Sequence, residues 1–343
     1  MEPTRLDSVR PLSRRLRCAR PRGFTLVELL VVVAIIALLV TILAPSLGRA
    51  KDLAQSTVCK VHLKGAGQAM RVYTSEWNGW LAGPNTSGYH LSLHYENYGG
   101  GDETPTTEPT QNMDWVSPTL GKAFGLPKER RERLVQILNT DLRCPANKEY
   151  YSGTAPGDGQ GSLGDADPET IRYSSFSAAL AFHVKGRKKQ VFDRDIMNHQ
   201  DVRPMVVVPD DYTPRLAAVG TPSRKVYAMD GARYVNSDTT ATFNFWLRQR
   251  KGGNFMEYGP GIALGSGTPY SLDMTGEEPT LRARNLRFAY RHSERINAIF
   301  FDAHAETLDL EESLDVEMYF PKGSYIRSAG LTQDPNDHNG EID

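Results

Sequence analysis

The chain has 343 residues, with 40 lysines and arginines against 41 aspartates and glutamates, and a formal net charge of −1. This balance excludes a general nucleic-acid binder, because such proteins carry a basic surplus that neutralises phosphates. The sequence has no G-x-S-x-G elbow, P-loop, H-E-x-x-H pair or dinucleotide fingerprint, so we expect a protein that is not an enzyme.

The N-terminus is strongly basic and is followed by an apolar stretch. Seven arginines precede position 24, and only Glu2 and Asp7 oppose them. From Leu26 to Ala44 the only charged residue is Glu28. A helix of this length rises roughly 28 Å, close to the ~30 Å hydrocarbon thickness of a bilayer. The sequence therefore predicts a transmembrane helix over residues 24–45, with a cytoplasmic N-terminus and an extracytoplasmic remainder.

Glu28 is unusual in this position. A carboxylate in hydrocarbon costs about 2.5–3.5 kcal/mol at mid-membrane and less near the end of a span. The run Gly23-Phe24-Thr25-Leu26-Val27-Glu28 resembles the processing site of type IV pilins and type II secretion pseudopilins. The resemblance implies that a prepilin peptidase removes residues 1–23 as a leader, cutting between Gly23 and Phe24, and methylates the new amino group of Phe24. It also implies that Glu28 pairs with the N-terminal amine of a neighbouring subunit.

Two other interpretations of this segment stay open. An ordinary secretory signal peptide would be cleaved near Ala44, which Pro45 and the lack of an A-x-A pattern disfavour. A plain signal anchor would make Glu28 incidental. Both are weaker accounts than pilin-like processing.

Residues 46–78 predict the amphipathic second half of one long N-terminal helix, which we name the spine (residues 24–78). Apolar or small residues recur near helical spacing, at Leu47, Ala50, Ala54, Val58, Ala66, Met70, Tyr73 and Trp77. Gly65 and Gly67 weaken the middle of this helix by about 1 kcal/mol each, so packing must hold it. Asn78-Gly79 is a stop signal.

The rest of the chain predicts an α+β domain over residues 79–330, followed by an acidic tail over 331–343 that we expect to be flexible. Strand-like runs occur at 171–182, 205–208, 225–229 and 296–301. A helix is predicted over 127–139, burying Leu134, Ile137 and Leu138. The expected fold is a pilin-like α-spine packed on an antiparallel β-sheet.

Two further blocks resemble a large bacterial group of pilin-like proteins with oversized soluble domains. One is Cys59 to Leu63, similar to a C-x-x-N-L pattern with histidine in place of asparagine. The other runs from His292 to His304 and is similar to an H-x9-D-G-H signature, with Ala303 in place of glycine. Physically, the second block predicts a strand, a tight turn at Asp302-Ala303 and a return strand.

Three cysteines occur, and Cys18 lies in the expected leader. Cys59 and Cys144 remain in a compartment that permits disulfides. A Cys59–Cys144 bridge and two separate buried thiols are both open from the sequence.

Two sets of possible metal ligands occur. His292, Asp302 and His304 are the residue types that zinc or iron selects, although turn-capping and surface roles explain Asp302 and His304 more simply, so we expect no metal centre. Oxygen ligands for calcium are clustered in two acidic segments, Asp158, Asp165, Asp167 and Glu169, and Asp334, Asp337, Glu341 and Asp343. We expect no cofactor, with calcium as the one ion that these segments would suit.

The sequence thus predicts a non-enzymatic pilin- or pseudopilin-like structural subunit in the inner (cytoplasmic) membrane, with a single span and a periplasmic domain. Its expected partners are a prepilin peptidase, other pilin subunits, inner-membrane assembly machinery and the lipid bilayer, with no nucleic acid. The alternative is a membrane-tethered module that binds polysaccharide or protein cargo, for which the tryptophans would provide stacking surfaces: Trp77, Trp80, Trp115 and Trp246. A metal-dependent enzyme using His292, Asp302 and His304 is the third possibility.

Overall fold

The computed structural model describes residues 23–83, 86–87, 103, 105–109, 114–150, 153–154, 172, 174–186, 206–231, 242–243, 255–256, 289–326 and 341–342. The chain divides into two units, residues 1–50 and residues 51–343. Helix α1 (Leu26–Glu76) has 51 residues and contributes to both units. In the first unit, every described residue is exposed. This part of α1 is long and apolar enough to cross a membrane, as the sequence predicts.

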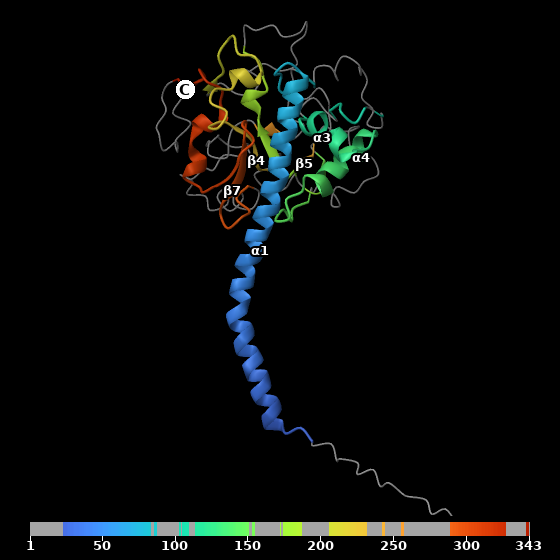
Figure 1. The fold of residues 1–343 in the computed structure, drawn as a ribbon, viewed down its shortest axis with the longest axis vertical. Helices are drawn as coiled ribbons and strands as arrows, with labels where there is room; N and C mark the ends of the chain where they lie inside the picture. Colours follow the sequence, from blue (N-terminus) through green and yellow to red (C-terminus); the bar gives the residue numbers. More distant parts are fainter. Residues whose placement is uncertain are drawn as a thin grey trace, which may run out of the picture. The chain divides into compact units, whose positions relative to one another are not determined.

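The second half of α1 packs on the soluble domain through one face (Figure 1). The buried residues recur every three or four positions: Ser56, Cys59, Leu63, Ala66, Gly67, Met70, Tyr73 and Thr74. The predicted stripe is wrong at Leu47, Ala50, Ala54, Val58 and Trp77, which are exposed. Its apolar spacing fitted two neighbouring faces of the helix, and the face that includes Cys59 is the one that packs. The helix ends at Glu76, just before the predicted stop.

A five-stranded sheet forms the centre of the domain, in the order β6-β2-β4-β7-β8. Four strands pair antiparallel: β2 (Phe176–Ala179), β4 (Val226–Asp230), β7 (Ile296–Phe300) and β8 (Ala305–Leu308). Strand β6 (Phe255–Met256) pairs parallel to β2. Every residue of β2, β4 and β7 is buried. The predicted α+β class, with a long helix and an antiparallel sheet, is confirmed, while the parallel edge strand was not foreseen.

Shorter elements surround the sheet. Helices α3 (Val116–Phe124) and α4 (Arg130–Gln136) are followed by a π-helical turn η1 (Ile137–Asp141). In the described residues, 3₁₀ turns occur at η3 (Leu180–Phe182), η5 (Leu216–Ala218), η6 (Glu312–Leu314) and η7 (Val316–Tyr319). Two-residue strands pair as β1 (Gly153–Thr154) with β5 (Thr242–Phe243), and as β3 (Val206–Val207) with β9 (Tyr325–Ile326).

The helix predicted over 127–139 is present but starts later, because Glu129 caps it by accepting a hydrogen bond from the backbone N–H of Glu132. Leu134, Ile137 and Leu138 are buried, as predicted. Helix α3 was not predicted.

Aromatic rings fill the core beside the sheet. Trp115 packs edge-on against Tyr227 with ring centroids 5.3 Å apart, and Phe182 packs against Phe301 at 4.9 Å. Trp115 is completely buried, so it is a core anchor rather than a stacking surface for a ligand.

The end of the chain is held at two described residues. The Ile342 side chain is buried, its N–H donates to the Ser324 carbonyl, and its own carbonyl accepts from Gly323. Ile342 is therefore anchored, while most of the tail lies outside the described residues and its flexibility stays a prediction. Of the acidic residues suggested for calcium, Glu341 is described. The rest lie outside the described residues: Asp158, Asp165, Asp167, Glu169, Asp334, Asp337 and Asp343. The domain boundaries and calcium binding stay predictions.

Candidate functional site

The expected processing site lies at the exposed start of α1. Phe24 is 70% exposed, and an added Cβ at Gly23 would meet nothing within 4 Å. Neither residue is in the helix. The Gly23–Phe24 peptide bond is therefore sterically open to a peptidase.

Glu28 and Thr25 cap the first turn of α1 reciprocally. The Glu28 carboxylate accepts hydrogen bonds from the Thr25 backbone N–H at 2.9 Å and from the Thr25 hydroxyl at 2.8 Å. The Thr25 hydroxyl in turn accepts from the Glu28 N–H at 3.3 Å. This capping box satisfies backbone donors that a helix start leaves unpaired. It also places the carboxylate one turn from Phe24, within the chain's own N-terminal segment.

A disulfide joins α1 to the loop that follows η1. Cys59 and Cys144 are bonded, with their Cα atoms 5.1 Å apart, and both residues are fully buried. Of the two arrangements that the sequence left open, the structure has the bridge. Cys18 lies outside the described residues.

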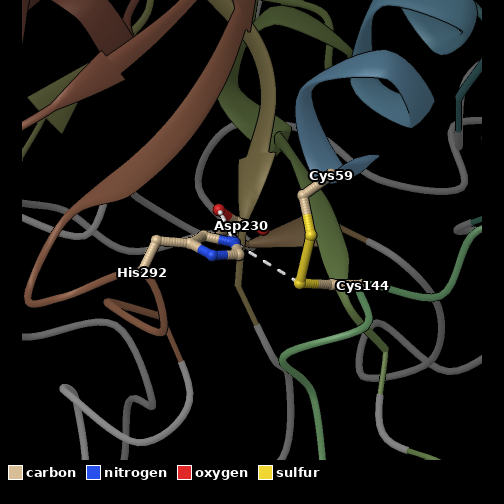
Figure 2. Close-up of side chains that lie close together, drawn as sticks. All are labelled: Cys59, Cys144, Asp230 and His292. Atoms are coloured by element: carbon tan, nitrogen blue, oxygen red, sulfur yellow. Dashed lines mark hydrogen bonds and ion pairs between the residues drawn. A yellow bond between two sulfur atoms is a disulfide. The ribbon is translucent and has the colours of Figure 1, made fainter. Parts of the chain in front are cut away.

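Beside the disulfide lies a buried charged cluster (Figure 2). Asp230, the last residue of β4, has one carboxylate oxygen 3.1 Å from the guanidinium of Arg291 and the other 3.4 Å from Nε2 of His292. The same imidazole nitrogen lies 3.4 Å from Sγ of Cys144. All of these side chains are almost completely buried. Burial of this many ionisable groups demands close pairing, because an unpaired buried charge costs several kcal/mol.

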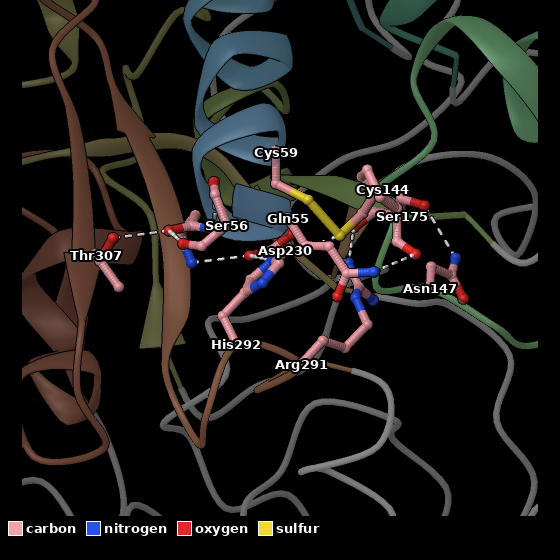
Figure 3. The surroundings of a disulfide bond; sticks show 12 residues. Gln55, Ser56, Cys59, Cys144, Asn147, Ser175, Asp230, Arg291, His292 and Thr307 are labelled. Atoms are coloured by element: carbon pink, nitrogen blue, oxygen red, sulfur yellow. Dashed lines mark hydrogen bonds and ion pairs between the residues drawn. A yellow bond between two sulfur atoms is a disulfide. The ribbon is translucent and has the colours of Figure 1, made fainter. Parts of the chain in front are cut away.

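Backbone and side-chain hydrogen bonds extend this cluster across the sheet (Figure 3). The N–H of Asn297 donates to Asp230 at 2.8 Å. The Asn297 side-chain oxygen accepts from the hydroxyls of Ser56 in α1 and Thr307 in β8. Arg291 also donates to the Ser175 carbonyl just before β2. The helix and three strands of the sheet therefore meet in one buried polar network.

Asp230 and Arg291 were not among the residues expected to form a site. The sequence held one signal for Asp230. The apolar run that begins at Val226 ends in this aspartate, just as the later apolar run ends at Asp302. Pairing between β4 and β7 is what brings Asp230 next to His292.

The second expected group, Asp302-Ala303-His304, forms the β7–β8 turn. Ala303 has φ +70°, its N–H donates to the Phe300 carbonyl, and the Phe300 N–H donates to the His304 carbonyl. This is a three-residue hairpin loop whose last residue is left-handed, where glycine is usual. Asp302 accepts from the backbone N–H and ring of His304. Partial burial raises the pKa of Asp302, but these hydrogen bonds outweigh burial and hold it below its usual value.

The structure does not bring His292, Asp302 and His304 together. His292 precedes β7 and Asp302 follows it, and a five-residue strand spans roughly 16 Å. His292 faces Asp230 and Cys144, whereas His304 stacks on Phe300 at the far end of the strand. The suggestion that neighbouring strands would join the three side chains in one metal site is therefore wrong, because β7 itself separates them.

Among the described residues, a different set has the geometry of metal ligands: Cys59, Cys144, Asp230 and His292. A cysteine–histidine–aspartate triad needs thiol and carboxylate on opposite ring nitrogens. Here both face Nε2 of His292, and Nδ1 is buried without a hydrogen-bond partner. The arrangement therefore suits shared coordination or packing rather than nucleophilic catalysis.

Tryptophans line a hollow near the end of α1. It measures about 260 Å³ and is bordered by Tyr73, Glu76, Trp77, Asn78, Trp80, Thr86 and Ser87. Trp77 is 51% exposed and stacks on Tyr73, and the guanidinium of Arg215 lies over Trp80. Burial raises the pKa of Tyr73 to about 12, so its hydroxyl stays protonated. Trp246 lies outside the described residues.

Comparison with known proteins identifies a match at the N-terminus. A family model for the prokaryotic N-terminal methylation motif matches residues 18–44, less than a tenth of the chain. The match covers Gly23, Phe24 and Glu28 and supports a pilin-like, processed N-terminus anchored in a membrane. No curated protein and no solved structure matches the chain significantly.

Proposed function

We propose that this chain is a non-enzymatic pilin- or pseudopilin-like subunit, which a prepilin peptidase processes and which assembles with other subunits through its spine. The observation that carries the proposal is the coincidence of the methylation motif with the fully exposed apolar half of α1. Lipid or the helices of neighbouring subunits can cover this surface, since both are apolar.

In the proposed assembly, Glu28 forms a charge pair between neighbouring subunits. The motif predicts a free, methylated amine on Phe24 after cleavage. A neighbouring subunit's Glu28 would pair with this amine, offsetting the cost of a carboxylate in hydrocarbon. The large domain, residues 79–330, would then decorate a type II secretion pseudopilus or a pilus-like filament from the periplasmic side of the inner membrane.

Two substitutions of Glu28 test this role. Glu28→Gln keeps a side chain that completes the capping box with Thr25 but removes the charge. Glu28→Ala removes both. If charge pairing drives assembly, both variants should stay in the membrane fraction and lose higher oligomers in chemical crosslinking. Crosslinking of Glu28→Gln at the unmodified level would contradict the proposal, because only the cap would then matter.

A surface-tethered binding module is the second candidate, favoured by the hollow beside Trp77 and Trp80. Its exposed ring, a carboxylate at Glu76 and an amide at Asn78 are the groups that bind sugars by stacking and hydrogen bonding. Its volume is below the ~300–1,000 Å³ of typical ligand pockets, which places this candidate second. Titration with oligosaccharides should quench tryptophan fluorescence in the unmodified chain but not in Trp77→Ala. An unchanged signal in both would remove this candidate.

A further inference from the structure

Four potential metal ligands converge where α1 meets the C-terminal end of β4 and the loop before β7. They are the sulfur atoms of Cys59 and Cys144, a carboxylate oxygen of Asp230 and an imidazole nitrogen of His292, and these atoms all lie within 4.8 Å of one another (Figure 2). The four residues come from separate parts of the sequence and are all buried.

We propose that these residues form a tetrahedral site for Zn²⁺ in the reduced protein, and that the disulfide and the metal are alternative ways of holding α1 to the domain. Two cysteines, one histidine and one carboxylate are ligand types that zinc selects. The proposal concerns the chain's redox state and does not depend on the proposed function.

Two of the observed separations are close to the edges of a zinc tetrahedron. With Zn–S near 2.3 Å and Zn–N near 2.0–2.1 Å, ligand atoms in a tetrahedral site lie about 3.5 Å apart. Nε2 of His292 lies 3.4 Å from Cys144 Sγ and 3.4 Å from Asp230 Oδ2. The Nε2–Oδ2 contact is longer than the 2.7–2.9 Å of a strong charged hydrogen bond. Once the cysteines are reduced, a metal ion can join all three atoms at close to these separations.

The charges of the site balance in the disulfide form, where Asp230 is paired with Arg291, and they balance again when two thiolates bind a divalent cation. Zn²⁺ with two thiolates is neutral, and the negative Asp230 is balanced by Arg291 at 3.1 Å. Neutrality matters here because all of these groups are buried and a residual charge would be poorly solvated. Arg291 and the N–H of Asn297 also fix the orientation of the carboxylate, as outer partners of metal ligands commonly do.

Reduction would leave the ligands in place. Leu63 and Ala66 remain buried on the sheet side of α1, and Ser56 donates to Asn297 of β7. On the other side, the Cys144 carbonyl accepts from the N–H of Asn147. The Cα atoms of the cysteines are 5.1 Å apart, so rotation about χ1 can separate the sulfur atoms to the distance that zinc needs without moving the backbone.

The conversion is chemically balanced with a dithiol as the reductant. The dithiol gives two electrons and two protons to the Cys59–Cys144 bond, becomes a disulfide itself and leaves two thiols. Binding of Zn²⁺ then releases those two protons, because thiolates are the ligands. A disulfide oxidant would reverse the process: it takes two electrons from the thiolates and two protons from water, becomes a dithiol, reforms the Cys59–Cys144 bond and releases the metal.

The test uses the full chain in detergent, with Cys18→Ser in every sample so that Cys59 and Cys144 are the only thiols. Protein reduced with a dithiol and freed of reductant is titrated with Co²⁺, whose absorption reports tetrahedral thiolate coordination, and with Zn²⁺, whose bound amount is measured by elemental analysis. We expect one equivalent in the reduced protein and none in the oxidised protein. His292→Ala should weaken binding at least about tenfold, since even an outer partner of a ligand costs that much. His304→Ala is the matched control and should bind normally.

Three results would overturn the proposal. They are less than half an equivalent of metal in the reduced protein, equal binding in the oxidised protein, and equal loss of binding in His304→Ala and His292→Ala. If the reduced chain unfolds, circular dichroism measures whether Zn²⁺ refolds it. Refolding by one equivalent of Zn²⁺ would support the site, because metal binding then supplies folding energy, and a failure to refold would refute it.

Discussion

The carboxylate of Asp230 lies 3.1 Å from the guanidinium of Arg291, and both side chains are almost completely buried. The pair joins the end of β4 to the segment before β7 at the place where the disulfide anchors α1. Buried pairs contribute little net stability compared with apolar residues, but breaking one leaves an uncompensated charge. The consequence can be measured.

Arg291→Leu should lower the free energy of unfolding by about 3–5 kcal/mol, because Asp230 is left buried without its cation. The double variant Asp230→Asn with Arg291→Leu should lose clearly less than the sum of the two single variants. Arg224→Leu is the control, since Arg224 pairs with Glu317 at 2.8 Å but is 64% exposed, and it should cost under about 1 kcal/mol. Thermal melts of the oxidised full chain in detergent compare the four. Additive single effects would show that the two charges do not interact.

Gly23→Arg should block removal of the leader, because the residue before the cut must be small for the junction to enter a peptidase. The variant should accumulate as a species heavier than the mature chain by residues 1–23. Mass spectrometry of the N-terminal peptide from unmodified protein should give methylated Phe24. A mature terminus at Met1, or one beyond Ala44, would contradict the pilin-like interpretation.

Ala303→Gly should stabilise the domain by about 1 kcal/mol, because Ala303 has φ +70° and glycine enters this region without a Cβ clash. Ala305→Gly is the matched control, and it should destabilise β8 because glycine weakens a strand. Melting temperatures of the two variants should move in opposite directions. A lower melting temperature for Ala303→Gly would mean that the turn is not strained in solution.

Two glycines of α1 should respond oppositely to the same substitution. A Cβ at Gly67 would lie 2.6 Å from Cγ1 of Ile299 in β7, so Gly67→Ala should cost about 1–3 kcal/mol by overpacking. A Cβ at Gly65 would meet nothing within 4 Å, so Gly65→Ala should stabilise the helix by up to about 1 kcal/mol. Equal effects in thermal melts would show that α1 does not pack on β7 at Gly67.

His183 should make the domain less stable as the pH falls. Burial lowers its pKa to about 3, although a hydrogen bond with the Ala82 carbonyl opposes the shift. The folded imidazole therefore stays neutral, while the unfolded one takes up a proton below its usual pKa of 6.5. Below pH 6.5, the free energy of unfolding should fall by about 1.4 kcal/mol for each pH unit from this residue.

His183→Gln removes this titration, so the difference in stability between the unmodified chain and the variant should shrink as the pH drops from 7.5 to 4.5. Melts at matched ionic strength measure the difference. A difference that does not vary with pH would show that His183 is solvated in the folded protein.

The sequence alone determined the features that depend on neighbouring residues. The apolar length after the arginines, the position of Glu28 and the stop at Asn78-Gly79 predict a long helix, since helix length, capping and termination are local properties. The strands near 226 and 296 and the turn at Asp302-Ala303 were likewise predictable from short patterns, and Ala303 takes the positive φ that the usual glycine would allow.

Only the tertiary structure decided which face of α1 is buried, that Cys59 meets Cys144, and that His292 belongs with Asp230 rather than with Asp302 and His304. These relationships join residues separated by 85 positions for the cysteines and 62 for Asp230 and His292. Helical spacing leaves adjacent faces nearly equivalent, and strand patterns do not say which strands pair. The strand order β2-β4-β7-β8 decides which strands are neighbours. It places the C-terminal end of β4 beside the loop before β7, and so the charges of Asp230 and Arg291 are buried next to the disulfide.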